Sequence, residues 1–109
     1  MNSINEKARR LAKMSADEIT AEERKQTGEL VDLIYEAIEG HGKTKDLPML
    51  SSVFAALVEV EAVWLATLDR DTRRCMRKSA EAARPKVLAA ALAKGLTRTQ
   101  LVTTARHDA

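Results

Sequence analysis

Apolar residues recur at helical spacing along most of the chain, and no stretch alternates with period two. Ile4, Ala8 and Leu11 recur at intervals of three and four residues, which predicts a first helix that ends near Met14. In residues 21–39 the apolar positions fall on one side of a helical projection and the carboxylates on the other. This pattern predicts a second helix with one buried face, closed by Gly40.

Two capping patterns precede that second helix. Ser15 is followed three residues later by Glu18, and Thr20 in the same way by Glu23. In such a box the hydroxyl and the carboxylate each satisfy a backbone N–H that the first helical turn leaves without a partner. The second box predicts that the helix begins near Ala21.

Residues 49–68 are apolar on nearly every side, so they predict a central helix, with Pro48 in its first turn. Whether this helix continues through Asp69–Asp71 is left open by the periodicity. A further helix is predicted to end near Ala83, because Pro85 disfavours helical geometry at the residue before it. Residues 86–94 and 97–106 predict two short helices separated by Gly95. The predicted fold is all-α, a compact bundle of five or six helices around the helix at 49–68, forming one domain over residues 1–109.

Charge is segregated along the chain, although the net charge is only +2. Residues 1–61 hold 8 Lys or Arg against 12 Asp or Glu, and residues 62–109 hold 10 against 4. Such asymmetry is typical of a protein with a charged partner, or of halves that pair with each other. The polar N-terminal segment and the single Cys75 predict a cytoplasmic protein, and Glu59 and Glu61 argue against a membrane span at 49–68.

The residues that could carry chemistry are few. His41 and His107 have no second ligand at helical spacing, so no metal or cofactor is predicted. Glu59 and Glu61 lie two positions apart and point to different sides of a helix, which excludes a shared acid–base role. A guanidinium is expected to meet one of these carboxylates, with Arg10, Arg73 and Arg77 as candidates. Cys75 is expected to be a small buried residue. The sequence therefore predicts a protein that is not an enzyme.

Two charged faces are the candidate partner-binding sites. The basic face has the spacing i, i+3, i+4, i+7, i+8 of one helical side, and the acidic face lies opposite the apolar side of the second helix. The basic face consists of Arg70, Arg73, Arg74, Arg77 and Lys78, and the acidic face of Glu29, Asp32, Glu36 and Glu39. A solvated surface is the simplest interpretation of either face. Phosphate contact, binding of a protein of opposite charge and pairing of the two faces remain open.

The C-terminal third permits a DNA-binding interpretation. Ala91, Gly95 and Leu101 have the spacing of a helix-turn-helix within residues 86–106, although Lys94 and Thr104 stand where that motif favours apolar residues. The second helix of such a pair presents side chains suited to base edges and phosphates, namely Arg98, Gln100, Thr103 and Arg106.

The sequence thus favours a small protein-binding module, an adaptor, regulator or inhibitor, that acts through charged helix faces and forms a homodimer. The expected partner is another protein, for which a nucleic-acid-handling protein is one candidate. The alternative is a helical DNA-binding regulator that uses residues 70–78 and 86–106.

Overall fold

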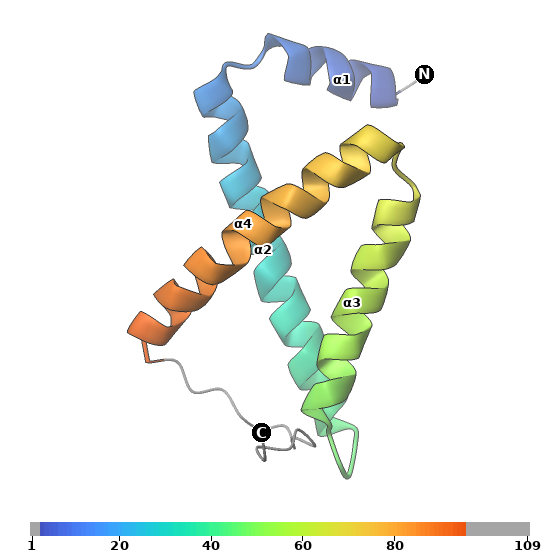
Figure 1. Cartoon of the computed structure of the whole chain (residues 1–109), viewed down its shortest axis with the longest axis vertical. Coiled ribbons are helices and arrows are strands. Elements are labelled where there is room, and N and C mark those ends of the chain that lie inside the picture. Colours follow the sequence, from blue (N-terminus) through green and yellow to red (C-terminus); the bar gives the residue numbers. More distant parts are fainter. Residues whose placement is uncertain (1–2, 96–109) are drawn as a thin grey trace. The chain divides into compact units, whose positions relative to one another are not determined.

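The computed structural model describes residues 3–95, which form four helices (Figure 1). These are α1 (Ser3–Lys13), α2 (Ala16–Lys43), α3 (Leu50–Ala66) and α4 (Arg70–Ala93). The all-α prediction is confirmed for this part of the chain. The predicted number of five or six helices is wrong here, because α4 is continuous where two helices were expected.

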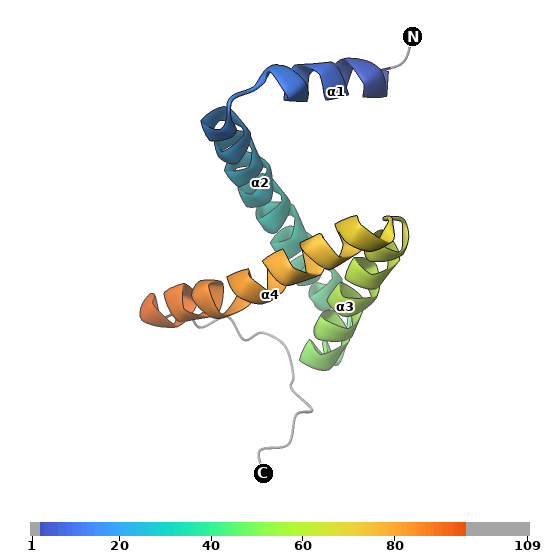
Figure 2. The same cartoon turned by 45° about the horizontal axis from the view of Figure 1, so that its top comes forward.

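The chain divides into two compact units, Met1–His41 and Gly42–Ala109. In the first unit, α1 turns away from α2 at Met14–Ser15 (Figure 2). In the second unit, α3 and α4 diverge from a short connection at Thr67–Asp69 and form an open V (Figures 1 and 2).

No residue between positions 3 and 95 is buried, so the predicted compact bundle around a central helix is not present in the described residues. Within the second unit, α3 is apolar on nearly all sides, whereas α4 is rich in charged residues. A single helix with so little apolar surface does not enclose a nearly apolar one.

The start of α2 shows why one capping box was misassigned. The Ser15 hydroxyl accepts a hydrogen bond from the Glu18 N–H at 3.1 Å, and a Glu18 carboxylate oxygen accepts one from the Ser15 N–H at 3.3 Å. The helix therefore begins at Ala16, five residues before the predicted start. Thr20 lies inside it and donates its hydroxyl proton to the Ala16 carbonyl at 3.0 Å.

Two other predicted boundaries are also wrong. Gly40 does not close α2, which continues to Lys43. Pro85 lies inside α4, although it has no N–H to donate to the carbonyl four residues earlier and its ring crowds that carbonyl. By contrast, Gly95 has the positive φ of 63° expected of a helix-ending glycine, and its N–H donates to the Leu92 carbonyl.

A break separates α3 from α4, which answers the question that the periodicity left open. Met49 precedes α3 as its N-cap, so Pro48 lies just before the helix rather than in its first turn. Asp69 caps α4, because its carboxylate accepts a hydrogen bond from the Thr72 N–H at 3.1 Å. Hydrogen bonds from the Thr72 side chain and backbone lower the pKa of the Asp69 carboxyl below its ordinary value.

Candidate interaction surfaces

The basic residues of α4 divide into two groups, those that bond to α3 and those that are exposed without such a bond. Arg73 is half-buried, and its guanidinium donates from Nε to the Leu65 carbonyl at 3.1 Å and from Nη2 to the Leu68 carbonyl at 2.9 Å. The Leu65 carbonyl lies in the last turn of α3, where the helix dipole is negative, and the Leu68 carbonyl lies in the connection that follows. Arg73 therefore joins α4 to α3 through its guanidinium, whereas the predicted face assigned it to a partner.

Arg84 also faces α3. Its Nη2 lies 3.2 Å from Oε2 of Glu61, and both side chains are largely exposed. A guanidinium does meet one of the two glutamates of α3, but Arg84 takes the place of the predicted candidates Arg10, Arg73 and Arg77. Glu61 and Arg84 are 23 positions apart, and helical spacing rules do not predict a contact at that separation.

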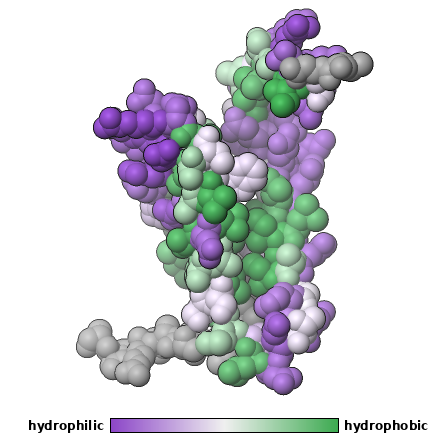
Figure 3. All heavy atoms as spheres, turned by 90° about the vertical axis from the view of Figure 1, so that its right-hand side faces the viewer, coloured by the Kyte–Doolittle hydropathy of each residue, from purple (hydrophilic) through white to green (hydrophobic). Residues whose placement is uncertain are grey.

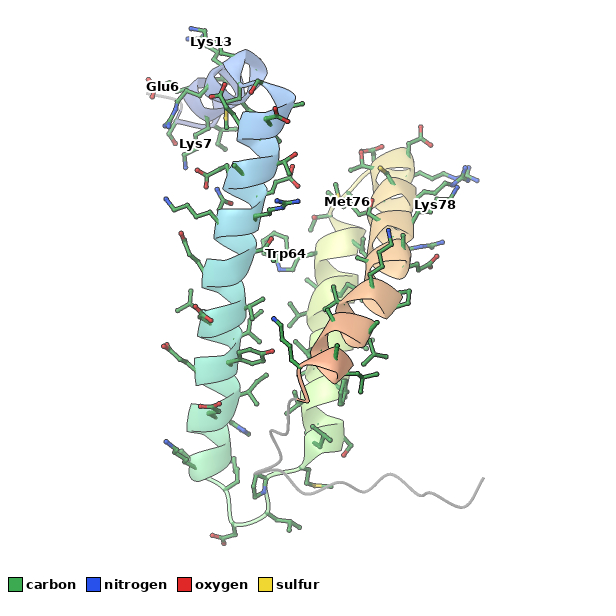
Figure 4. All side chains as sticks on the ribbon, turned by 90° about the vertical axis from the view of Figure 1, so that its left-hand side faces the viewer. Glu6, Lys7, Lys13, Trp64, Met76 and Lys78 are labelled. Carbon is green, nitrogen blue, oxygen red and sulfur yellow. The ribbon has the colours of Figure 1, made fainter. Side chains whose placement is uncertain are left out.

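The remaining basic residues form a ridge along the first half of α4. Arg70, Arg74, Arg77 and Lys78 are all exposed, and none makes a hydrogen bond or ion pair with the described part of the chain. We call these four residues the basic ridge. Three of them, together with Arg73, line a hollow of about 220 Å³. Lys78 and Met76 lie on opposite sides of α4 (Figure 4), so the ridge is confined to one side of the helix.

The acidic face lies on α2 as the sequence predicts. Glu29, Asp32, Glu36 and Glu39 are exposed, and the first three make no ion pair within residues 3–95. At the spacing i, i+3, i+7 and i+10 these carboxylates occupy one side of α2. We call them the acidic stripe.

A third surface is the apolar side of α3, which the sequence predicted as part of a central helix. A hollow of about 440 Å³ is lined by Ala56, Glu59, Val60, Val63 and Trp64, whose spacing of i, i+3, i+4, i+7 and i+8 defines one helical side. Trp64 is 69% exposed and lies on the side of α3 away from α4 (Figure 4). Figure 3 shows hydrophobic side chains along α3. The spacing was visible in the sequence, but it was interpreted as core because all sides of the helix are apolar.

Other predicted sites have simpler outcomes. Cys75 is exposed, which contradicts its predicted burial, because it lies on a side of α4 that nothing covers. Within residues 3–95 no three His, Cys, Asp or Glu residues gather to hold a metal ion. Arg98, Gln100, Thr103 and Arg106 lie outside the described residues, as does the second helix of the predicted helix-turn-helix.

Comparison with known protein families, curated proteins and solved structures gives no match to this chain. None of the helices in the described part has the length and apolarity to cross a bilayer.

Proposed function

We propose that this chain is a non-enzymatic, self-associating protein-binding module. The observation that carries the proposal is the apolar side of α3, where Val60, Val63 and Trp64 are 56%, 61% and 69% exposed. Large side chains at neighbouring positions of one helix form a contiguous patch, and such patches mark contact sites. Tryptophan is among the residues that contribute most to binding at such sites.

The occupant of this surface is a second copy of the chain. The apolar residues of α3 face all directions, so several neighbouring helices are needed to cover them. Within its own unit α3 contacts α4, and it does so through Arg73 and Glu61, which leaves the opposite side open. A two-fold dimer places the same side of α3 from each copy in contact and shields both at once.

The residues that line the hollows on α3 and α4 support the non-enzymatic part of the proposal. The hollow on α3 carries a single titratable group, Glu59, among apolar side chains. The hollow on α4 is lined by four guanidinium groups. Neither lining pairs a nucleophile with a general base, which hydrolytic and transfer chemistry requires.

Sedimentation equilibrium tests self-association. The wild-type chain is expected to be dimeric at micromolar concentration, and V60E/V63E is expected to be monomeric because two carboxylates then enter an apolar contact. Leu11→Glu is the matched control, since it places a carboxylate at another exposed apolar position, in α1, and is expected to leave the dimer intact. A monomeric wild-type chain, or a dimer that V60E/V63E leaves unchanged, overturns the proposal.

The acidic stripe of α2 is the proposed contact for a different protein, one with a basic surface. Its exposed carboxylates favour rapid, salt-sensitive association with such a partner. Affinity capture at low and high salt is expected to retain a basic protein on the wild-type chain and to lose it with E29K/E36K. Capture that is insensitive to both salt and E29K/E36K contradicts this role.

A further inference from the structure

The basic ridge of α4 is held in an arrangement that is unfavourable within the chain itself. Arg70 and Arg74 lie four residues apart on one side of the helix, where like charges repel each other. Arg70 also lies in the first turn, where a positive charge opposes the helix dipole. No carboxylate of the described residues pairs with either of them.

The basic residues that face α3 have partners, in contrast to those of the ridge. The Arg73 guanidinium donates hydrogen bonds to the Leu65 and Leu68 carbonyls, and the Arg84 guanidinium forms an ion pair with Glu61. Arg73 thereby fixes one wall of the 220 Å³ hollow, while Arg70, Arg74 and Arg77 contribute guanidinium groups with donors to spare. A hollow lined by arginines selects an oxyanion, because a guanidinium forms two parallel hydrogen bonds with a phosphate or carboxylate.

The length of the ridge favours a polyphosphate backbone over a single anion. At 1.5 Å of rise per residue, Arg70 to Lys78 covers about 12 Å. A DNA strand carries one phosphate for about every 3.4 Å of duplex axis, so the ridge lies within reach of about four consecutive phosphates.

We propose that the basic ridge of α4 binds the phosphate backbone of nucleic acid without reading its sequence. The ridge consists of phosphate-type contacts alone, and such contacts position a protein on a duplex without specifying bases. This inference is independent of the self-association proposed above, because it uses other residues on another helix.

Fluorescence anisotropy with a labelled 20-base-pair duplex of mixed sequence tests this inference. With about four phosphate contacts, the logarithm of the binding constant is expected to fall with the logarithm of salt concentration with a slope of roughly −3.6. R74E/R77E is expected to weaken binding at least tenfold at low salt and to make the slope shallower by about 2. Circular dichroism of the same variant verifies that the helices persist.

Lys86→Glu provides a matched control, because Lys86 lies on the same helix but about 160° around it from Arg70. At about 0.1 M salt it is expected to retain wild-type affinity within about twofold, since a Debye length of about 10 Å screens a distant exposed charge. Poly-L-glutamate represents an acidic protein as the ligand. At equal total charge it is expected to displace the labelled duplex poorly. Three results overturn the proposal. The chain does not bind the duplex at low salt, R74E/R77E and Lys86→Glu lose the same amount of duplex affinity, or poly-L-glutamate displaces the labelled duplex as well as unlabelled duplex does. In sedimentation equilibrium, R74E/R77E is expected to have the same oligomeric state as the wild type.

Discussion

Arg84 of α4 reaches Glu61 of α3, and its Nη2 lies 3.2 Å from the nearer carboxylate oxygen. The Arg84 side chain is 61% exposed and that of Glu61 is 47% exposed, so water and salt screen the pair. The ion pair therefore sets which parts of the two helices meet more than it stabilises their contact.

Urea unfolding of Glu61→Gln, Arg84→Gln and the double variant measures this pair. We expect a coupling free energy of about 0.5 kcal/mol, because exposed ion pairs contribute little. The coupling is expected to shrink at high salt. A coupling several times larger, unaffected by salt, contradicts the exposed geometry.

Removing the Arg73 side chain is expected to cost more than removing that of Arg74. Arg73→Ala leaves the Leu65 and Leu68 carbonyls without their charged donor, which we expect to cost about 1.5 kcal/mol of unfolding free energy. Arg74→Ala removes an exposed side chain without a partner in residues 3–95, so its cost is expected to stay within about 0.5 kcal/mol. Thermal or urea unfolding checks the order, and equal costs exclude a structural role for Arg73.

Ser15 and Thr20 test which capping pattern is used. Ser15→Ala removes the acceptor of the Glu18 N–H and is expected to destabilise the first turn of α2 by about 1 kcal/mol. Thr20→Ala removes a hydroxyl bonded to a carbonyl within the helix and is expected to be neutral or slightly stabilising. Amide hydrogen exchange over residues 16–19 is the measurement. Faster exchange in Thr20→Ala than in Ser15→Ala is the opposite of what the geometry requires.

Acid is expected to weaken the start of α4 through Asp69. Hydrogen bonds from Thr72 lower the pKa of this carboxyl, so its contribution to stability is present above the ordinary aspartate pKa of about 3.9 and is lost as the pH falls through the lower folded-state value. Asp69→Asn keeps a capping side chain that does not titrate. NMR chemical shifts of residues 70–73 below about pH 4 are expected to change in the wild type and to change less in Asp69→Asn. Identical titrations in the two proteins contradict the role of Asp69.

Local signals predicted several elements of the fold. The spacing of apolar residues placed α1 and α3 within about two residues of their observed bounds, and Gly95 ended the last described helix as expected. These features depend on neighbouring residues, which a sequence displays directly.

The errors arose where two local signals competed. Thr20 and Glu23 have the spacing of a capping box, but the box of Ser15 and Glu18 starts the helix earlier and leaves Thr20 inside it. Pro85 was expected to end a helix, yet α4 continues past it. The missing hydrogen bond and the crowding by the proline ring disfavour a helix at Pro85, but they do not end one that both flanking segments favour.

The sequence predicted which charged residues share a helix face, but it did not predict the role of each residue. Helical spacing placed all five basic residues on one side, but it does not distinguish Arg73, which turns to the end of α3, from the exposed arginines beside it. That distinction depends on the break at Thr67–Asp69, which brings the start of one helix to the end of another. The pair of Glu61 and Arg84 depends on the same turn of the chain.

The emission of Trp64, the only tryptophan, tests the central claim of a self-associating apolar side on α3 most directly. Its maximum is expected to lie at long wavelength in dilute solution, where the indole is exposed to water, and to move to shorter wavelength as the concentration rises through the dimerisation range. V60E/V63E is expected to keep the long-wavelength maximum throughout. An emission maximum that stays constant across concentrations in the wild-type chain would contradict coverage of α3 by a second copy.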